Sequence, residues 1–101
     1  MNDIRERIQK HWGEVKKHRI WLHQHPESSG EEKMTPVYIA EVLRGMGLKP
    51  QEHVGGNGVV AVIDGQAGGK CVGLRADFDA LEVTETSDFP FPSLTPGMAH
   101  A

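Results

Sequence analysis

The sequence is poor in several features that would define a protein class at once. Its 101 residues include one cysteine, two tryptophans, one tyrosine and three phenylalanines, and its 11 basic side chains face 14 acidic ones. A single cysteine cannot form an internal disulfide, which fits a reducing cytoplasm. Without a basic surplus, neither nucleic acid nor an anionic membrane is expected as the main partner.

Long hydrophobic runs are absent as well. The longest apolar stretch, Val59 to Ile63, is far too short to span a membrane, and the first six residues contain no signal-peptide core. The hydrophobic share of 38% and the charged share of 25% are ordinary for globular proteins. We therefore expect a globular cytoplasmic chain with room for one small domain at most.

Two segments have the apolar spacing of helices. The first covers residues 2–25 and should end before Pro26, because the residue preceding a proline is disfavoured in helical geometry. The second lies within residues 30–46, with Gly47 as its stop. It could start early, capped by Ser28 or Ser29, or late at Thr35-Pro36. An internal proline costs about 3 kcal/mol, which favours a late start or a kink.

Strands are predicted for the middle of the chain, at residues 51–54, 58–64 and 70–76. The glycine-rich turn at 65–69 should pair the last two strands antiparallel. Residues 82–101 show no periodicity and are expected to be irregular. The predicted fold class is α/β, with two N-terminal helices followed by a short three-stranded mixed or antiparallel sheet.

The strand core Val59–Ile63 is apolar at every position, a pattern typical of strands buried on both faces. Two helices can cover one face of a three-stranded sheet, which would leave the other face without a partner. The alternative is one helix on each face.

Acidic residues follow the last predicted strand. If that strand continues, Arg75, Asp77 and Asp79 lie on one side by alternation. Two carboxylates there could support a cation or form a pair with divided pKa values. The structural alternative is an Arg–Asp ion pair at the strand end, with the second Asp capping a turn.

Other candidates are weaker. His23 and His25 could chelate a metal together from a strand, but residues two apart on a helix point in opposite directions, so structural roles are favoured. The glycines of segment 55–58 indicate a turn with positive φ, since the segment precedes a strand. His100 could act as an acid, base or ligand. Cys71 is expected to be a buried, inert thiol.

Taken in order, these segments resemble the N-terminal part of the hippurate-hydrolase-like amidohydrolases, a metallopeptidase subfamily that includes N-acyl-amino-acid amidohydrolases and auxin-conjugate hydrolases. The resemblance rests on four stretches: Leu-His-Gln-His-Pro-Glu at 22–27, the second helix with Glu31 and Glu32, the strand from Gly58, and Leu-Arg-Ala-Asp-Phe-Asp-Ala-Leu at 74–81 followed by Glu85. Departures are Phe78 for the usual Met, Glu82-Val83 for proline–hydrophobic, and Pro36.

The resemblance implies where the chemistry lies. In the family, the stretch that ends here at Ala101 runs into Cys-Gly-His-Asp, which carries metal ligands, so the expected ligands follow Ala101. Asp79 matches an acid near the metal, and Asp77 flanks it. Arg75 and His100 join them as supporting candidates, whereas no catalytic residue, cofactor-binding residue or metal ligand is expected within the chain.

Residues 1–101 would then form the incomplete N-terminal part of a single catalytic domain, without the family's dimerisation domain. The complete enzyme would hydrolyse small N-acyl amino acids with a divalent metal (Zn, Mn, Co or Ni) and would be a homo-oligomer. We expect this chain alone to bind no metal tightly and to be inactive. The alternative is a self-contained small α/β interaction domain.

Overall fold

A computed structural model describes residues 2–66, 68–86 and 89–100. Its elements follow one another in the order α1 (Asn2–Lys10), α2 (Trp12–Gln24), α3 (Met34–Gly45), β1 (Gln51–Val54) and β2 (Gly58–Val60). The α/β class is confirmed, although the sheet has two strands rather than three among these residues.

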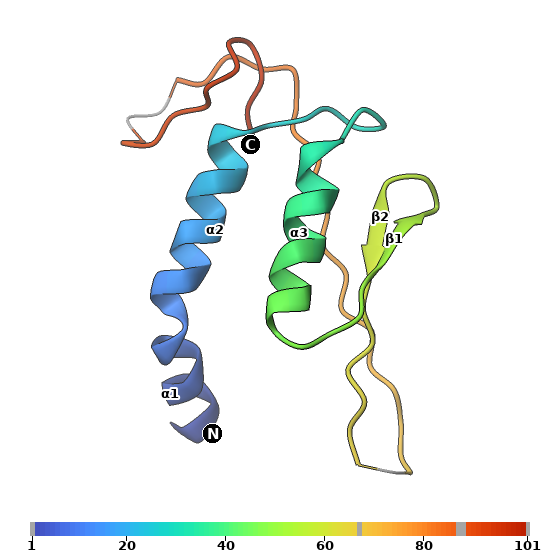
Figure 1. Cartoon of the computed structure of the whole chain (residues 1–101). Coiled ribbons are helices and arrows are strands. Elements are labelled where there is room, and N and C mark those ends of the chain that lie inside the picture. Colours follow the sequence, from blue (N-terminus) through green and yellow to red (C-terminus); the bar gives the residue numbers. More distant parts are fainter. Residues whose placement is uncertain (1, 67, 87–88, 101) are drawn as a thin grey trace.

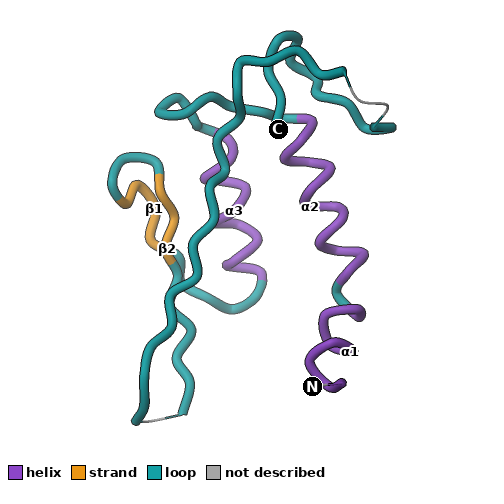
Figure 2. The backbone as a smooth tube through the Cα atoms, turned by 180° about the vertical axis from the view of Figure 1, so that it is seen from behind, coloured by secondary structure: helices purple, strands orange, loops and turns teal. Residues whose placement is uncertain are grey.

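The helices and the strands lie side by side (Figure 1). α1 and α2 follow one line, α3 lies beside α2, and the β1–β2 hairpin lies on the far side of α3. From behind, an extended segment after the strands runs along α3 to the end of α2, where the last described residues also lie (Figure 2). The N-terminal end of the chain lies at the opposite end of the molecule.

The first predicted helix is interrupted, so its prediction as one helix over 2–25 is wrong in that detail. His11 has φ −99° and ψ 1°, and its N–H bonds the Ile8 carbonyl at 3.1 Å in a tighter turn. Gly13 follows within two residues and lowers the helix propensity locally. The end of α2 at Gln24, just before His25-Pro26, agrees with the prediction.

α3 has the late start, with Pro36 in its first turn. The Glu27 carboxylate accepts hydrogen bonds from the N–H groups of Lys33, Met34 and Thr35 at 2.9, 3.0 and 2.6 Å. Partial burial raises the pKa of Glu27, but these bonds outweigh it and lower the pKa to about 2. A side chain outside the helix therefore satisfies its first donors.

The predicted stop of α3 is confirmed at Gly47. Its φ of 86° suits glycine, and the Leu48 N–H bonds the Leu43 carbonyl at 3.1 Å, which closes the helix end.

The predicted turn between the first two strands is confirmed. β1 pairs antiparallel with β2, with Gln51 opposite Val60 and Val54 opposite Gly58. Gly55 and Gly56 have φ values of 64° and 113°, which favour glycine.

The rest of the predicted sheet is wrong. β2 ends at Val60 rather than residue 64, and residues 70–76 form no strand. We call residues 61–66 and 68–76 the arm. Ala67, within the predicted turn, lies outside the described residues. A strand needs a partner for the backbone groups along at least one of its edges, and none of the described residues pairs with the arm as a strand.

Apolar side chains of the arm are exposed. Val62, Ile63, Val72 and Leu74 are 68%, 78%, 83% and 98% exposed. Cys71 is exposed too, so its prediction as a buried thiol is wrong. Val62 and Ile63 belong to the apolar run Val59–Ile63, so part of that run is uncovered.

The core is small and lies between α2, α3 and the later chain. Ala40, Ala80 and Ala99 are its buried apolar residues. Trp21 stacks on Tyr38 at 3.9 Å between ring centroids and joins α2 to α3. No described helix is long and apolar enough to cross a membrane.

Candidate functional site

Two short backbone pairings gather distant segments beyond the end of α2. The Ala80 N–H bonds the Glu27 carbonyl at 2.7 Å, within a parallel bridge between Ser28 and Ala80. Leu81 and Ala99 exchange both N–H···O bonds, at 2.9 and 3.0 Å. These bonds hold the backbone at Ala80–Leu81 next to both Glu27 and Ala99.

This pairing brings two of the candidate residues together. Asp79 precedes Ala80 and is half-buried, and His100 follows Ala99 and is half-buried as well. A cavity of about 440 Å³ is lined by both His100 and His23. Its remaining lining residues are Val15, His18, Arg19, Leu22, Asp77 and Phe78.

The electrostatics of His100 differ from those of an exposed histidine. Burial lowers its pKa below the usual 6.5, and neighbouring His23 lowers it further. Asp79 and the backbone of Leu22 favour the charged ring but do not outweigh burial. The Nε2 atom of His100 is buried and has no hydrogen-bond partner among the described residues. The fold thus favours a neutral imidazole with one unused polar atom.

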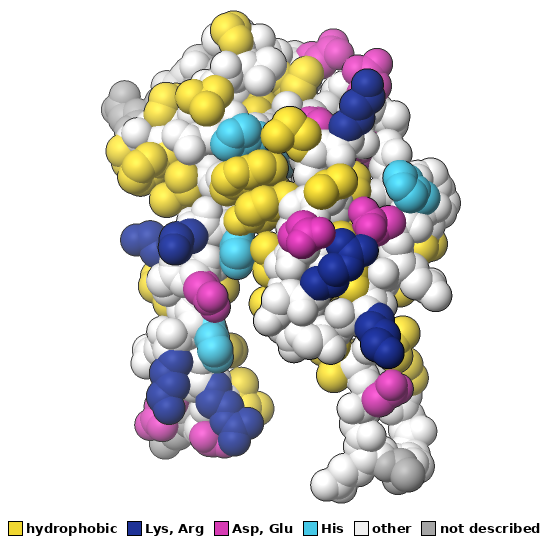
Figure 3. Space-filling model, viewed as in Figure 1, with side chains coloured by type: hydrophobic (Ala, Val, Ile, Leu, Met, Phe, Trp, Pro, Cys, Tyr) yellow, Lys and Arg dark blue, Asp and Glu magenta, His cyan; other side chains and the backbone are white. Residues whose placement is uncertain are grey.

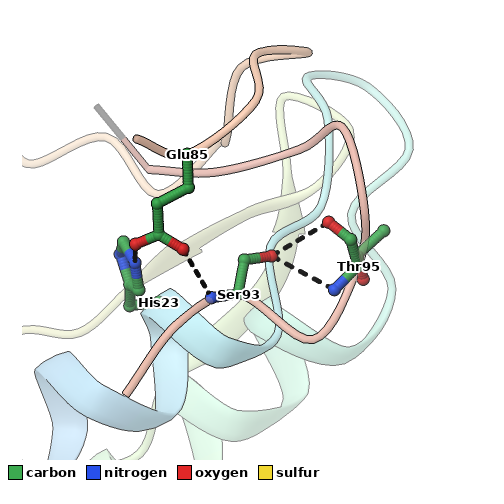
Figure 4. Close-up of polar contacts among 4 residues, drawn as sticks. All are labelled: His23, Glu85, Ser93 and Thr95. Carbon is green, nitrogen blue, oxygen red and sulfur yellow. Dashed lines mark hydrogen bonds and ion pairs between the residues drawn. The ribbon is translucent and has the colours of Figure 1, made fainter. Parts of the chain in front are cut away.

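His23 also belongs to a polar cluster with Glu85, Ser93 and Thr95 (Figure 4). Its Nε2 pairs with Glu85 Oε1, and Glu85 Oε2 accepts the Ser93 N–H at 2.9 Å. The Ser93 hydroxyl bonds both the N–H and the carbonyl of Thr95, each at 3.1 Å. The His23 and Phe89 rings meet nearly at right angles, with 4.9 Å between their centroids. His23 is therefore held by groups from a distant loop.

His25 does not join this cluster. Its Nδ1 bonds the Trp21 carbonyl at 2.7 Å and its ring stacks on the Trp21 indole at 4.3 Å. The structural interpretation of the two histidines agrees with these contacts.

Arg75 and Asp77 are exposed, whereas Asp79 is half-buried. Arg75 pairs with Asp77 at 2.8 Å, with side chains 85% and 66% exposed. The expected alternation along one strand is wrong, because no strand forms there. Arg75, Asp77 and Asp79 do border one open hollow of about 810 Å³, which faces the glycine turn 55–58.

The sequence analysis missed the pairing of Glu85 with His23. It noted Glu85 only as a match to the family pattern, and 62 residues separate the two side chains. The usable signal was the combination of an acidic residue in an irregular segment and a histidine in the last turn of a helix.

The described residues do not complete a metal site. Within residues 2–66, 68–86 and 89–100, no three His, Cys, Asp or Glu side chains converge to hold an ion. Asp79 and His100 together offer fewer ligands than a protein metal site requires. A bound metal would therefore need ligands from other residues.

The fold of the chain matches that of a solved protein structure along the whole chain. The crystal structure of a protein from methicillin-resistant Staphylococcus aureus, described as an aminohydrolase, matches the whole chain with a TM-score of 0.91 and 39% identity, over 27% of its own length. No protein-family model matches the chain.

Sequence relatives point to the same family. Hippurate hydrolase of Campylobacter jejuni is 36% identical over 88% of the chain and 23% of its own length. Thermostable carboxypeptidase 1 of Saccharolobus solfataricus is 42% identical over 99% of the chain and 25% of its own length. The chain is a homologue of the amidohydrolases that include hippurate hydrolase, and these relatives imply a metal-dependent family. It spans about a quarter of the length of the curated relatives it matches.

Proposed function

We propose that the chain forms the first part of the catalytic domain of an amidohydrolase that cleaves N-acyl amino acids. The observation that carries the proposal is the convergence of Asp79 and His100 through the Ala80 and Leu81–Ala99 pairings. The similarity of the whole chain to 27% of an aminohydrolase structure supports it.

The substrate class follows from the chemistry that the relatives' names share. Hippurate is benzoylglycine, an amino acid whose nitrogen carries an acyl group, and a carboxypeptidase substrate also ends in an acylated amino acid. Both substrates place the scissile amide next to a carboxylate. We therefore propose a small N-acyl amino acid as the substrate of the complete enzyme.

The exposed surface supports the proposal that the domain is incomplete. The chain exposes 8377 Å² at a mass of 11.1 kDa, whereas a compact monomer of that mass exposes about 5,700 Å². Its radius of gyration is 15.8 Å, compared with about 13 Å for a compact chain of 100 residues. Figure 3 shows the cause, because α1 and the arm project from the body as two separate extensions.

The metal enters this proposal only through residues beyond those described. We propose a divalent metal, with Asp79 and His100 as supporting groups beside it rather than as a complete ligand set. What the described residues do by themselves is hold a neutral imidazole next to a carboxylate. We also propose a cytoplasmic, homo-oligomeric enzyme, as expected from the single cysteine and from the family resemblance.

Grafting tests the proposal. Residues 1–101 replace the matching segment of Campylobacter hippurate hydrolase, and glycine release from hippurate is measured. We expect activity from the graft, loss of most of it in Asp79→Ala, and none from the 101-residue chain alone. The parent hydrolase and the graft carrying Glu31→Ala, an exposed residue, serve as controls.

Two outcomes would overturn the proposal. One is a folded graft that is inactive while the parent hydrolase is active, which favours a self-contained interaction domain. The other is hydrolysis by the purified 101-residue chain that is absent from a mock preparation, since the proposal leaves the chain without a complete site.

A further inference from the structure

Glu85 lies in the loop between Leu81 and Ala99 and connects this loop to α2. The mutual hydrogen bonds of Leu81 and Ala99 join the two ends of this loop. Glu85 lies inside this loop and both of its carboxylate oxygens have partners. One pairs with His23 of α2, and the other accepts the N–H of Ser93, in the second half of the loop (Figure 4). One side chain thus connects a helix to both halves of the loop.

The His23–Glu85 contact is shielded from water. The two side chains are 11% and 16% exposed, and the Phe89 ring packs against the His23 ring. Hydrogen bonds to a charged group are stronger than neutral ones, and a buried partner left without its bond is costly. The loop has a second tie to the same helix end, because the Leu94 N–H bonds the Gln24 carbonyl at 3.0 Å.

The position of His100 depends on this loop, because His100 comes directly after its last residue. His100 follows Ala99 directly, and it shares the walls of the 440 Å³ cavity with His23. A displacement of His23 or of the returning chain would therefore move His100 relative to Asp79.

We propose that Glu85 is a positioning residue, which clamps His23 and the Ser93 backbone so that His100 stays beside Asp79. This inference rests on the proposed function in treating that pair as part of an active site. Glu85 acts through the groups that its two carboxylate oxygens hold, the His23 ring and the Ser93 N–H.

The first experiment uses the 101-residue chain and NMR. In Glu85→Gln the charge is removed while the size is kept. We expect the Ala99 N–H to exchange about tenfold faster with solvent and the His100 ring resonances to shift, while amides in the middle of α3 keep their protection. The matched control is Glu82→Gln, an exposed glutamate in the same loop, which should change neither signal. Unchanged Ala99 and His100 signals in Glu85→Gln would overturn the inference.

The second experiment uses the active graft and separates positioning from loop stability. Glu85→Gln should lower kcat about tenfold, because the hydrogen bonds that hold the clamp are charge-assisted, with KM changed less than twofold. Glu82→Gln should leave both constants unchanged. A rise in KM alone, or an equal loss in both variants, would contradict a positioning role. An inactive wild-type graft would instead refute the proposed function, and the NMR result would then decide the role of Glu85 separately.

Discussion

Two regions of the later chain, residues 79–100 and the arm, contrast sharply in how they are held. Beyond the end of α2, residues 79–100 carry few regular elements, yet backbone pairings and the Glu85 carboxylate hold them in place. The arm includes most of two predicted strands, yet most of its side chains are exposed and no described residue pairs with it as a strand. Order in this chain follows from available partners rather than from local propensity.

The largest expected effect concerns the arm. In the double variant Ile63→Asn/Leu74→Asn, binding of a hydrophobic dye should fall several-fold, because both side chains are among the most exposed apolar groups. Helix content measured by circular dichroism should stay constant. The control Ile4→Asn changes an exposed residue of α1 and should reduce dye binding much less. Equal dye binding by wild type and double variant would show that the contrast between the two regions is wrong.

A smaller effect is expected at the Glu27 cap. In Glu27→Gln, the amides of Met34 and Thr35 should lose about twofold in hydrogen-exchange protection, because a helix cap contributes about 0.5 kcal/mol at the low end. Because the folded pKa is about 2 and the ordinary value is 4.5, wild-type protection should be full above about pH 4.5 and decline as the pH falls toward 2. The variant should show no such decline.

Glu31→Gln provides the control for that measurement, since the Glu31 side chain is exposed and accepts a hydrogen bond from the Ser28 hydroxyl at 3.2 Å. Wild-type protection that is independent of pH in this interval would contradict the assignment of the cap to the Glu27 carboxylate.

The smallest expected effect is a shift in the titration of His100. Because Asp79 favours the charged ring, Asp79→Asn should lower the already depressed pKa of His100 further. Asp77→Asn should leave it unchanged, since Asp77 is exposed and paired with Arg75. NMR titration of the ring protons checks both. In wild type, the folded state binds fewer protons than the unfolded state just below pH 6.5, so this residue makes stability rise with pH there.

Local signals made part of the fold predictable. Pro26 and Pro36 restrict the backbone, and Gly47 permits the positive φ that ends α3, so the helix ends follow from neighbouring residues. Gly55 and Gly56 marked the turn for the same reason.

The errors concern contacts made over a distance. The Glu27 carboxylate caps a helix that begins seven residues later, and the arm forms no strand because strands depend on neighbours that no local pattern specifies. For the site, alternation singled out Asp79, His100 was noted as a possible acid, base or ligand, and the resemblance then made both supporting candidates. Alternation grouped Arg75 with Asp79 because it assumed a strand that does not form.

The large exposed surface of the folded chain has a thermodynamic consequence. Unfolding a chain of 11.1 kDa to about 16,000 Å² of accessible surface would uncover about 10,400 Å² from a compact native state. From the observed 8377 Å² it uncovers about 7,700 Å². Since the denaturant m-value and the heat-capacity change both scale with newly exposed surface, both should be about three-quarters of those of a compact domain of equal length. The isolated chain should therefore unfold over a broad range of urea concentration, and the same residues in a complete enzyme over a narrow one.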